Sequence, residues 1–219
     1  MPIAYRHRTD ATPAKAPLPG LSVHRETDVA VMAALQSRTE AEIAARFAAG
    51  NRAYVATVFG LPAAWGWVAT GSAAIGELKA SFEVASAERY LWNFVTLPAF
   101  RGRGIYPRLL DAIVATEMDE AEWFWIAYAP ENRASGTGIL KAGFTTVAEL
   151  SFDMKGNPVV KDIRKGGGTA ASALFGLPAI NEAVAQCWKC ARMGKPVESS
   201  CAPGACSCDY QKPQVECAA

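Results

Sequence analysis

The chain has 219 residues, a formal net charge of +1 at pH 7 and a hydrophobic fraction of 51%. This length suits one domain of about 150 residues plus an appendage, and the apolar content is ample for a buried core. The balanced charge offers no basic excess for nucleic acid, and no apolar run approaches the ~20 residues that cross a bilayer. The first residues lack the apolar core of a signal peptide, so we expect a cytoplasmic protein without nucleic-acid or membrane partners.

The N-terminal part predicts an arm, a strand and two helices. Residues 1–20 mix Pro, Ala, Lys and Arg without a period, which indicates a flexible arm. Residues 21–25 alternate apolar and polar side chains, as a strand does. Asp28 is the expected N-cap of a first helix. Thr39-Glu-Ala-Glu42 has the form of a capping box and predicts the start of a second helix.

The next part predicts mainly strands. Segments 51–59 and 63–70 predict a hairpin around Gly60-Leu-Pro62. The secondary structure of residues 71–87 is not decided by their pattern, and one strand is expected there, near residues 78–84. The apolar run over 88–96 predicts a further strand.

Helices and strands then alternate. Residues 104–117 place apolar side chains near helical spacing, and residues 123–128 predict a buried strand. A short helix over 135–141 and a strand over 145–153 follow. Residues 159–163 come after a Gly-Asn-Pro turn and are expected to pair back on that strand.

This order predicts a mixed α/β domain over residues 21–165, with a mostly antiparallel sheet flanked by helices. The first 20 residues would be the arm, and residues 166–219 would hold a linker, a helix and a tail. Gly166-Gly-Gly168 has the composition of a linker. Residues 170–192 predict a helix that is interrupted at Gly176-Leu-Pro178.

A glycine-rich basic turn, Arg101-Gly-Arg-Gly-Ile-Tyr106, stands between the strand over 88–96 and the helix that follows. Glycines let the backbone approach a ligand closely, and the first N–H groups of a helix lack intrahelical partners and favour an anion. Pro107 suits this first turn, where its missing N–H costs no hydrogen bond. The turn therefore predicts a pyrophosphate site, with an ordinary basic surface turn as the alternative.

The amino-acid sequence of this turn resembles the acetyl-CoA-binding signature of the GCN5-related N-acetyltransferases, Arg/Gln-x-x-Gly-x-Gly/Ala. Arg101 takes the first place of the signature and Gly104 the fourth, whereas Tyr106 departs from the Gly or Ala of the sixth place. A second segment is similar to the same family: Asn132 and Ser135 lead into a short helix and a Lys-x-Gly-Phe step. The resemblance covers about residues 20 to 160.

The resemblance implies the acetyl-CoA N-acyltransferase fold, in which two central strands splay apart around the pantetheine of the cofactor. It implies acetyl transfer from acetyl-CoA to an amine of a small molecule or a protein. Backbone groups of 94–97 would line the pantetheine. The cofactor-binding positions implied in this way are Phe94, Val95, Thr96, Leu97, Arg101, Gly102, Arg103, Gly104, Ile105, Tyr106, Asn132 and Ser135.

One departure from the family's pattern concerns the group that protonates the leaving thiolate. Many members carry a Tyr seven residues after the Asn, where it can protonate the leaving thiolate, but this chain has Ile139 there. Tyr106 and Tyr128 are the nearest candidates for that acid.

A general base must accept the proton of the attacking amine. The two histidines lie near the N-terminus, so Glu88 on the strand before the turn is the first candidate, ahead of Glu83 and Glu77. A solvated charge at a strand end is the alternative role of Glu88.

Every cysteine of the chain lies in its last part. These are Cys187, Cys190, Cys201, Cys206, Cys208 and Cys217. Clustered thiolates can converge on zinc or another thiophilic metal, and a short tail with few large apolar residues needs such a staple to fold. The spacing differs from a double Cys-x2-Cys ribbon, so disulfides and free thiols stay open.

Two functions follow. The first is an acetyl-CoA-dependent N-acetyltransferase with a cysteine-rich tail that holds metal. The alternative is a metal- or thiol-based sensor on the same scaffold, with little or no transferase activity. The sequence leaves the oligomeric state open, with a homodimer as one alternative.

Overall fold

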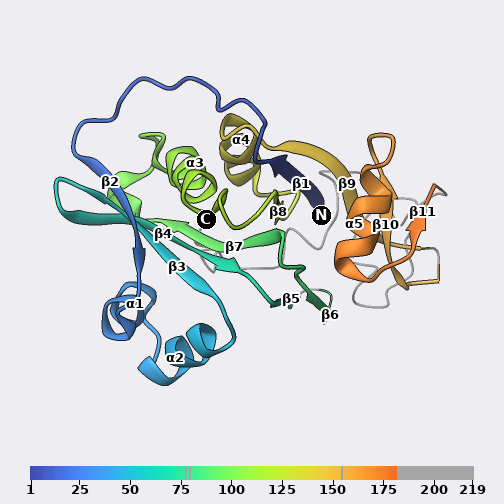
Figure 1. Ribbon diagram of the computed structural model, residues 1–219, viewed down its shortest axis with the longest axis horizontal. Coiled ribbons are helices and arrows are strands. Elements are labelled where there is room, and N and C mark those ends of the chain that lie inside the picture. The colour runs from blue at the N-terminus through green and yellow to red at the C-terminus, as the bar shows by residue number, and fades with distance from the viewer. Residues whose placement is uncertain (77, 79, 154, 182–219) are drawn as a thin grey trace.

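The computed structural model describes residues 1–76, 78, 80–153 and 155–181. Its centre is a nine-stranded sheet in the order β11-β10-β9-β1-β8-β7-β4-β3-β2. The helices are α1 (Val29–Gln36), α2 (Glu40–Ala48), α3 (Ile105–Glu117), α4 (Arg133–Lys141) and α5 (Gly167–Phe175). Helices α3 and α4 cover one face of the sheet, and α1, α2 and α5 pack on the other (Figure 1).

The nine strands of the sheet are β1 (Pro2–His7), β2 (Leu21–Glu26), β3 (Arg52–Val58), β4 (Leu61–Ala69), β7 (Glu88–Thr96), β8 (Trp123–Ala127), β9 (Thr145–Phe152), β10 (Pro158–Asp162) and β11 (Ala179–Ile180). A separate hairpin joins β5 (Ser72–Ile75) to β6 (Ala80–Glu83). Only the pairs β7–β8 and β10–β11 are parallel among the strands described. The predicted fold class, a mixed α/β arrangement with a mostly antiparallel sheet flanked by helices, is confirmed.

Local signals placed several elements correctly. The Asp28 side chain accepts hydrogen bonds from the backbone N–H groups of Ala30 and Val31, as an N-cap does. Thr39 and Glu42 form both halves of the capping box at the start of α2. The predicted hairpin is β3–β4, and β10 pairs back on β9 as expected.

The prediction of a flexible arm over residues 1–20 is wrong for its first part. Residues 2–7 form β1, which lies between β8 and β9 and pairs antiparallel with both. Ile3 and Ala4 are fully buried. The basic residue that suggested a solvated arm is also buried, because the Arg6 guanidinium donates to Asp111 Oδ1 at 3.0 Å and to the Ala142 carbonyl at 2.8 Å. Long-range pairing therefore outweighed the local composition.

The glycines expected to form a linker open helix α5 instead. A Cβ atom on Gly167 would lie 2.6 Å from the carbonyl oxygen of Val147, so glycine permits the helix to touch β9 directly. Gly176, in the left-handed conformation, ends the helix, which is where the sequence predicted an interruption. Beyond Gly176 the predicted helix is wrong for the described residues, because Ala179–Ile180 form β11 and pair with β10; residues 182–192 lie outside the described part of the chain.

A buried charge cluster ties α3 to β3 and β7. The Glu117 carboxylate is 1% exposed and accepts hydrogen bonds from Arg89 Nε at 2.7 Å, Arg52 Nη1 at 2.6 Å and the Tyr54 hydroxyl. Burial alone would raise the pKa of this carboxyl, but the hydrogen bonds from Tyr54, Arg89 and Arg52 outweigh burial and hold its pKa below the usual value.

The cysteine tail and Glu77 lie outside the described residues. Within the described ranges no group of three or more His, Cys, Asp and Glu side chains could hold a metal ion. No helix in the same ranges is long and apolar enough to span a membrane.

Candidate active site

The pairing of the two parallel strands at the centre of the sheet, β7 and β8, stops part-way along β7, because β8 ends at Ala127. Their register runs from the pair Glu88 and Trp123 to the pair Leu91 and Ile126, and β7 then continues to Thr96. A cavity of about 520 Å³ opens where the pairing ends. In this described region the edge of β7 that faces β8 has no strand partner beyond Leu91, so its backbone groups are available to a bound molecule.

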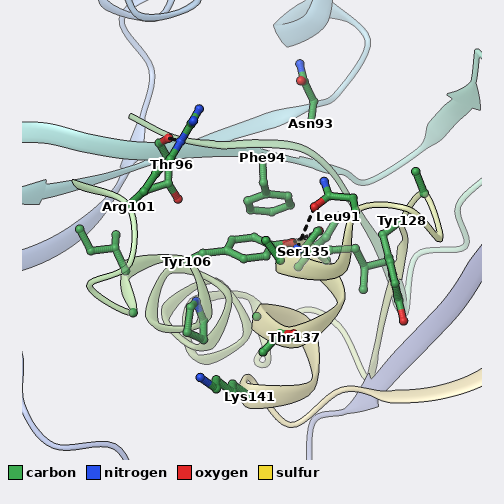
Figure 2. A pocket seen from close by; sticks show the side chains of 18 of the residues that line it. Leu91, Asn93, Phe94, Thr96, Arg101, Tyr106, Tyr128, Ser135, Thr137 and Lys141 are labelled. Atoms are coloured by element: carbon green, nitrogen blue, oxygen red, sulfur yellow. Dashed lines mark hydrogen bonds between the residues drawn. The ribbon is translucent and has the colours of Figure 1, made fainter. Parts of the chain in front are cut away.

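A β-bulge in β7 shapes the wall of this cavity. Asn93 has a φ of 53°, and the register between β4 and β7 shifts opposite Gly66. A Cβ atom on Gly66 would lie 2.1 Å from the Phe94 ring, so only glycine lets that ring lie across β4. Figure 2 shows the Phe94 ring above that of Tyr106, while Asn93 points away from them; the two ring centroids are 5.5 Å apart.

The glycine-rich turn leads from β7 to α3 through a short 3-10 helix, Pro98–Phe100. Gly102 and Gly104 have φ angles of 74° and 70°, in the left-handed region that favours glycine. Helix α3 has no side-chain cap among the described residues. Gly102, Gly104 and Ile105 line the cavity, so the first N–H groups of α3 and the positive end of its helix dipole lie there.

Two cationic side chains line the cavity and one does not. Arg101 donates through Nε to the Thr96 carbonyl at 3.1 Å, which fixes it beside the end of β7. Lys141, in the last turn of α4, lines the cavity from the helix side (Figure 2). The guanidinium of Arg103 lies over the Phe100 ring, 5.5 Å from its centroid, and Arg103 does not line the cavity.

Tyr106, the departure from the resembled signature, is accommodated by a glycine on the neighbouring helix. A Cβ atom on Gly138 would lie 2.4 Å from the Tyr106 ring. The Tyr106 hydroxyl lies 3.4 Å from Ser135 Oγ. Burial raises the pKa of Tyr106 well above its usual value, and the hydrogen bond with Ser135 opposes this only in part. The hydroxyl therefore keeps its proton at neutral pH.

The same helix carries the other predicted polar positions. Asn132 caps α4, because its side-chain oxygen accepts a hydrogen bond from the Ser135 N–H at 3.0 Å. Tyr128 packs against Gly136, where a Cβ atom would lie 2.7 Å from the tyrosine ring. Ile139, where a tyrosine was expected from the resemblance, is fully buried in the core. Tyr106 and Tyr128 thus bring phenol groups to the cavity from other elements.

Most predicted site residues come together in one cavity. Those that line it are Phe94, Thr96, Arg101, Gly102, Gly104, Ile105, Tyr106, Tyr128, Asn132 and Ser135. The side chain of Val95 packs on the opposite face with Trp65, because neighbouring residues of a strand alternate. The Leu97 N–H donates to the Ala63 carbonyl at 2.9 Å, and Leu97 does not line the cavity.

Glu88, the candidate base, is not part of this site. It begins β7, six residues before Phe94, which is about 20 Å along an extended strand. Its carboxylate accepts a hydrogen bond from Trp125 Nε1 at 3.2 Å and lines a second cavity on the other face of the sheet. The sequence pattern marks β7 as a strand but does not tell which of its ends borders the cavity of about 520 Å³.

Several lining residues had not been predicted. They include Asn93, Phe100, Thr137, Gly138 and Lys141. The alternation of small residues in Ala134-Ser-Gly-Thr-Gly138 was an available signal, since glycines at this spacing on one helix permit large side chains to approach.

Comparison with known proteins gives distant structural similarities. No family model matches the sequence, and no curated protein matches it. The GCN5-related N-acetyltransferase from Kribbella flavida is 15% identical with a TM-score of 0.39; the match covers 66% of this chain and 53% of that protein, so the chain spans about half its length.

Two further structures are similar. Aminoglycoside acetyltransferase AAC(6')-Iy, solved in complex with the bisubstrate analogue CoA-S-monomethyl-acetylneamine, is 16% identical with a TM-score of 0.47, over 60% of this chain and 95% of that one. Ribosomal-protein-alanine N-acetyltransferase from Brucella melitensis biovar Abortus is 10% identical with a TM-score of 0.43, over 56% and 89%. At these identities and scores the similarities assign no activity, so the function has to be argued from the cavity itself.

Proposed function

We propose that this protein is an acetyl-CoA-dependent N-acetyltransferase that acts on an amine of a small molecule or a protein. One observation carries the proposal: a single cavity joins the part of β7 that extends beyond its pairing with β8 to the N-terminus of α3, which has no side-chain cap among the described residues. Unpaired strand edges suit an amide-rich chain, and a glycine turn at a helix N-terminus suits a pyrophosphate. Acetyl-CoA contains both parts.

The described residues fit acetyl-CoA in a definite order. The backbone N–H groups from Gly102 to Tyr106 would hold the pyrophosphate, with Arg101 and Lys141 adding positive charge. The free edge of β7 beyond Leu91 would hydrogen-bond the pantetheine amides. When bound, acetyl-CoA supplies an acetyl group activated as a thioester.

A hydroxyl side chain can supply the proton for the leaving group in this site. The Tyr106 phenol is protonated at neutral pH, as an ordinary tyrosine is, and it lines the cavity beside Ser135, so it can donate a proton to a leaving thiolate there. No Asp, Glu or His of the described chain lines the cavity. We therefore assign removal of the proton from the attacking amine to water, which backbone carbonyls at the free edge of β7 could hold in place by accepting its hydrogen bonds.

The test is acetyl-CoA binding followed by turnover with the full-length protein. Calorimetry should show one site for acetyl-CoA, with free CoA competing. A panel of small amines and amine-bearing peptides should then release CoA thiol at a rate that depends on the amine. Absence of acetyl-CoA binding would refute the proposal.

We also propose that the cysteine tail binds zinc. Support comes from the clustering of all six cysteines between residues 187 and 217 and from the affinity of zinc for thiolates. Elemental analysis of full-length protein and of a Cys187→Ser/Cys190→Ser variant tests it. Loss of stoichiometric metal in the variant supports the site, whereas six titratable thiols and no metal would refute it.

The sensor alternative has a distinct signature. It predicts stoichiometric metal in a protein that shows no turnover with any amine. Cytoplasmic location and the oligomeric state stay predictions from the sequence.

A further inference from the structure

A second cavity lies on the opposite face of the sheet from α3 and α4, and the acetyl-transfer proposal does not use it. Its volume is about 570 Å³. Strands β7, β8, β1 and β9 form its floor, and the loop before α5 with the first turns of that helix forms its rim. Figure 1 shows α5 beside β9 and β10, at the side of the sheet away from β2.

Strand register explains which side chains meet there. Glu88 pairs with Trp123 across β7 and β8, and Tyr5 pairs with Trp125 across β1 and β8. Thr145 pairs with Tyr5 on the other side. Paired residues share a face of the sheet, so one carboxylate and three aromatic side chains occupy adjacent places on this face.

The aromatic rings stand as walls at steep angles to one another. The rings of Tyr5 and Trp123 have centroids 5.1 Å apart and planes inclined at 79°, and those of Tyr5 and Trp125 are 5.4 Å apart at 63°. Tyr5 and Trp123 are only partly buried and line the cavity, and the His7 ring lies against Trp123 with the ring centroids 4.5 Å apart. The helix side is lined by the small residues Ala170 and Ala173, which leaves room for a ligand.

Opposite charges lie at the two ends of the cavity. Glu88 is half-buried on β7, and its Oε1 accepts from Trp125 Nε1. Arg164 and Lys165 line the cavity from the rim beside β9, where the Arg164 N–H donates to the Val147 carbonyl at 3.0 Å. Neither cation forms an ion pair with any described residue. Strands β7 and β9 are three strand spacings apart, about 14 Å.

We propose that this cavity is a separate binding site for a zwitterion whose ammonium and carboxylate groups stand at opposite ends, as in an ω-amino acid. The ammonium would lie at the Glu88 carboxylate and against the faces of Trp123 and Tyr5, since aromatic faces attract cations. The carboxylate would meet Arg164 and Lys165. Because Glu88 on β7 and the two cations beside β9 line opposite sides of the cavity, a ligand with its two charged groups several atoms apart suits the site better than an α-amino acid, in which both groups share one carbon.

Three probes of equal chain length test the charge assignment. Full-length protein is titrated with 5-aminopentanoate, pentylamine and pentanoate, using calorimetry and the fluorescence of the cavity tryptophans. We expect 5-aminopentanoate to bind at one site, and each singly charged probe to bind roughly ten- to a hundredfold more weakly. Binding of 5-aminopentanoate that is no tighter than binding of pentanoate would overturn the proposal, as would no binding at all.

Matched variants separate the two ends of the site. Glu88→Gln keeps the shape of the side chain and should weaken 5-aminopentanoate and pentylamine about tenfold while leaving pentanoate unchanged. Arg164→Ala/Lys165→Ala should weaken 5-aminopentanoate and pentanoate but not pentylamine. Trp123→Leu should weaken both amines, and Lys155→Ala, an exposed charge outside the cavity, should change nothing. Wild-type affinity in Glu88→Gln and in Arg164→Ala/Lys165→Ala, both folded by circular dichroism, would overturn the proposal.

Discussion

Replacing Gly138 by Ala tests how α4 admits the Tyr106 ring. The added Cβ would lie 2.4 Å from the ring, and the ring has Phe94 on its other side at 5.5 Å between centroids. Overpacking of this kind costs about 1–3 kcal/mol. Alanine is also a better helix former than glycine, by about 1 kcal/mol. The net result is a destabilisation of about 0–2 kcal/mol.

A double-mutant cycle isolates the contact from the helix propensity. In a Tyr106→Ala background the ring is absent, so Gly138→Ala should stabilise the protein by about 1 kcal/mol. The coupling between the two positions is then about 1–3 kcal/mol, and each kcal/mol moves the Tm by about 2–4 °C for a chain of this size. The assay is chemical and thermal unfolding of the four proteins followed by circular dichroism.

The cycle has one outcome that contradicts the reasoning. If Gly138→Ala stabilises the protein equally in both backgrounds, the coupling is zero and Gly138 does not serve to admit Tyr106. The same four proteins should also be titrated with acetyl-CoA. A ring displaced by the new Cβ moves into the cavity, so Gly138→Ala alone should weaken that binding.

Three further predictions concern the site and the buried charges. Tyr106→Phe should lower turnover about 10²–10⁴-fold, as expected for loss of a general acid, with acetyl-CoA affinity and Tm nearly unchanged; steady-state kinetics at saturating acetyl-CoA decide this, and unchanged turnover would remove Tyr106 from the mechanism. Arg101→Ala should weaken acetyl-CoA binding about ten- to a hundredfold in calorimetry, whereas Arg103→Ala, outside the cavity, should not; equal effects would show that the difference in placement is irrelevant. Glu117→Gln should destabilise the protein by about 3–5 kcal/mol, because it breaks a buried charge cluster. Since the folded pKa of Glu117 lies below its unfolded value near ~4.3, its contribution is complete above that value and is lost as pH falls through the folded pKa. Denaturant unfolding from about pH 7 to about pH 3 should therefore show that the free energy of unfolding falls less with decreasing pH in Glu117→Gln than in the wild-type protein. The same pH dependence in the two proteins would contradict this account.

The local sequence pattern was sufficient to predict the secondary structure of the segment from β7 to α3, which lines much of the candidate site. The strand over 88–96 was predicted with its exact bounds, and α3 begins within one residue of the expected start. The signals there are short-range: an apolar run, two glycines with positive φ and a proline in the first turn of the helix. They depend on the backbone of the segment itself, so sequence reasoning could find them.

Features that depend on distant partners were not predicted. The burial of Arg6 requires Asp111 and the Ala142 carbonyl, which no window around Arg6 contains. The glycines at 166–168 have a linker's composition, yet Gly167 is there because β9 passes against it. Glu88 was chosen only for its strand, and a strand pattern does not tell which face of the sheet or which end of the strand borders the cavity; Glu88 lines the second cavity instead.

The position of β1 has a consequence for the order in which the chain folds. Ile3 pairs with Ala127 on one side and Ala148 on the other, so the earliest strand of the chain joins two of the later ones. Hairpins such as β3–β4 close over short loops, but β8 and β9 share no hydrogen bonds with each other and meet only through β1. During synthesis β1 therefore stays unpaired until β8 and β9 have left the ribosome. Closure of this side of the sheet is the step of highest contact order and should be the slow step of folding.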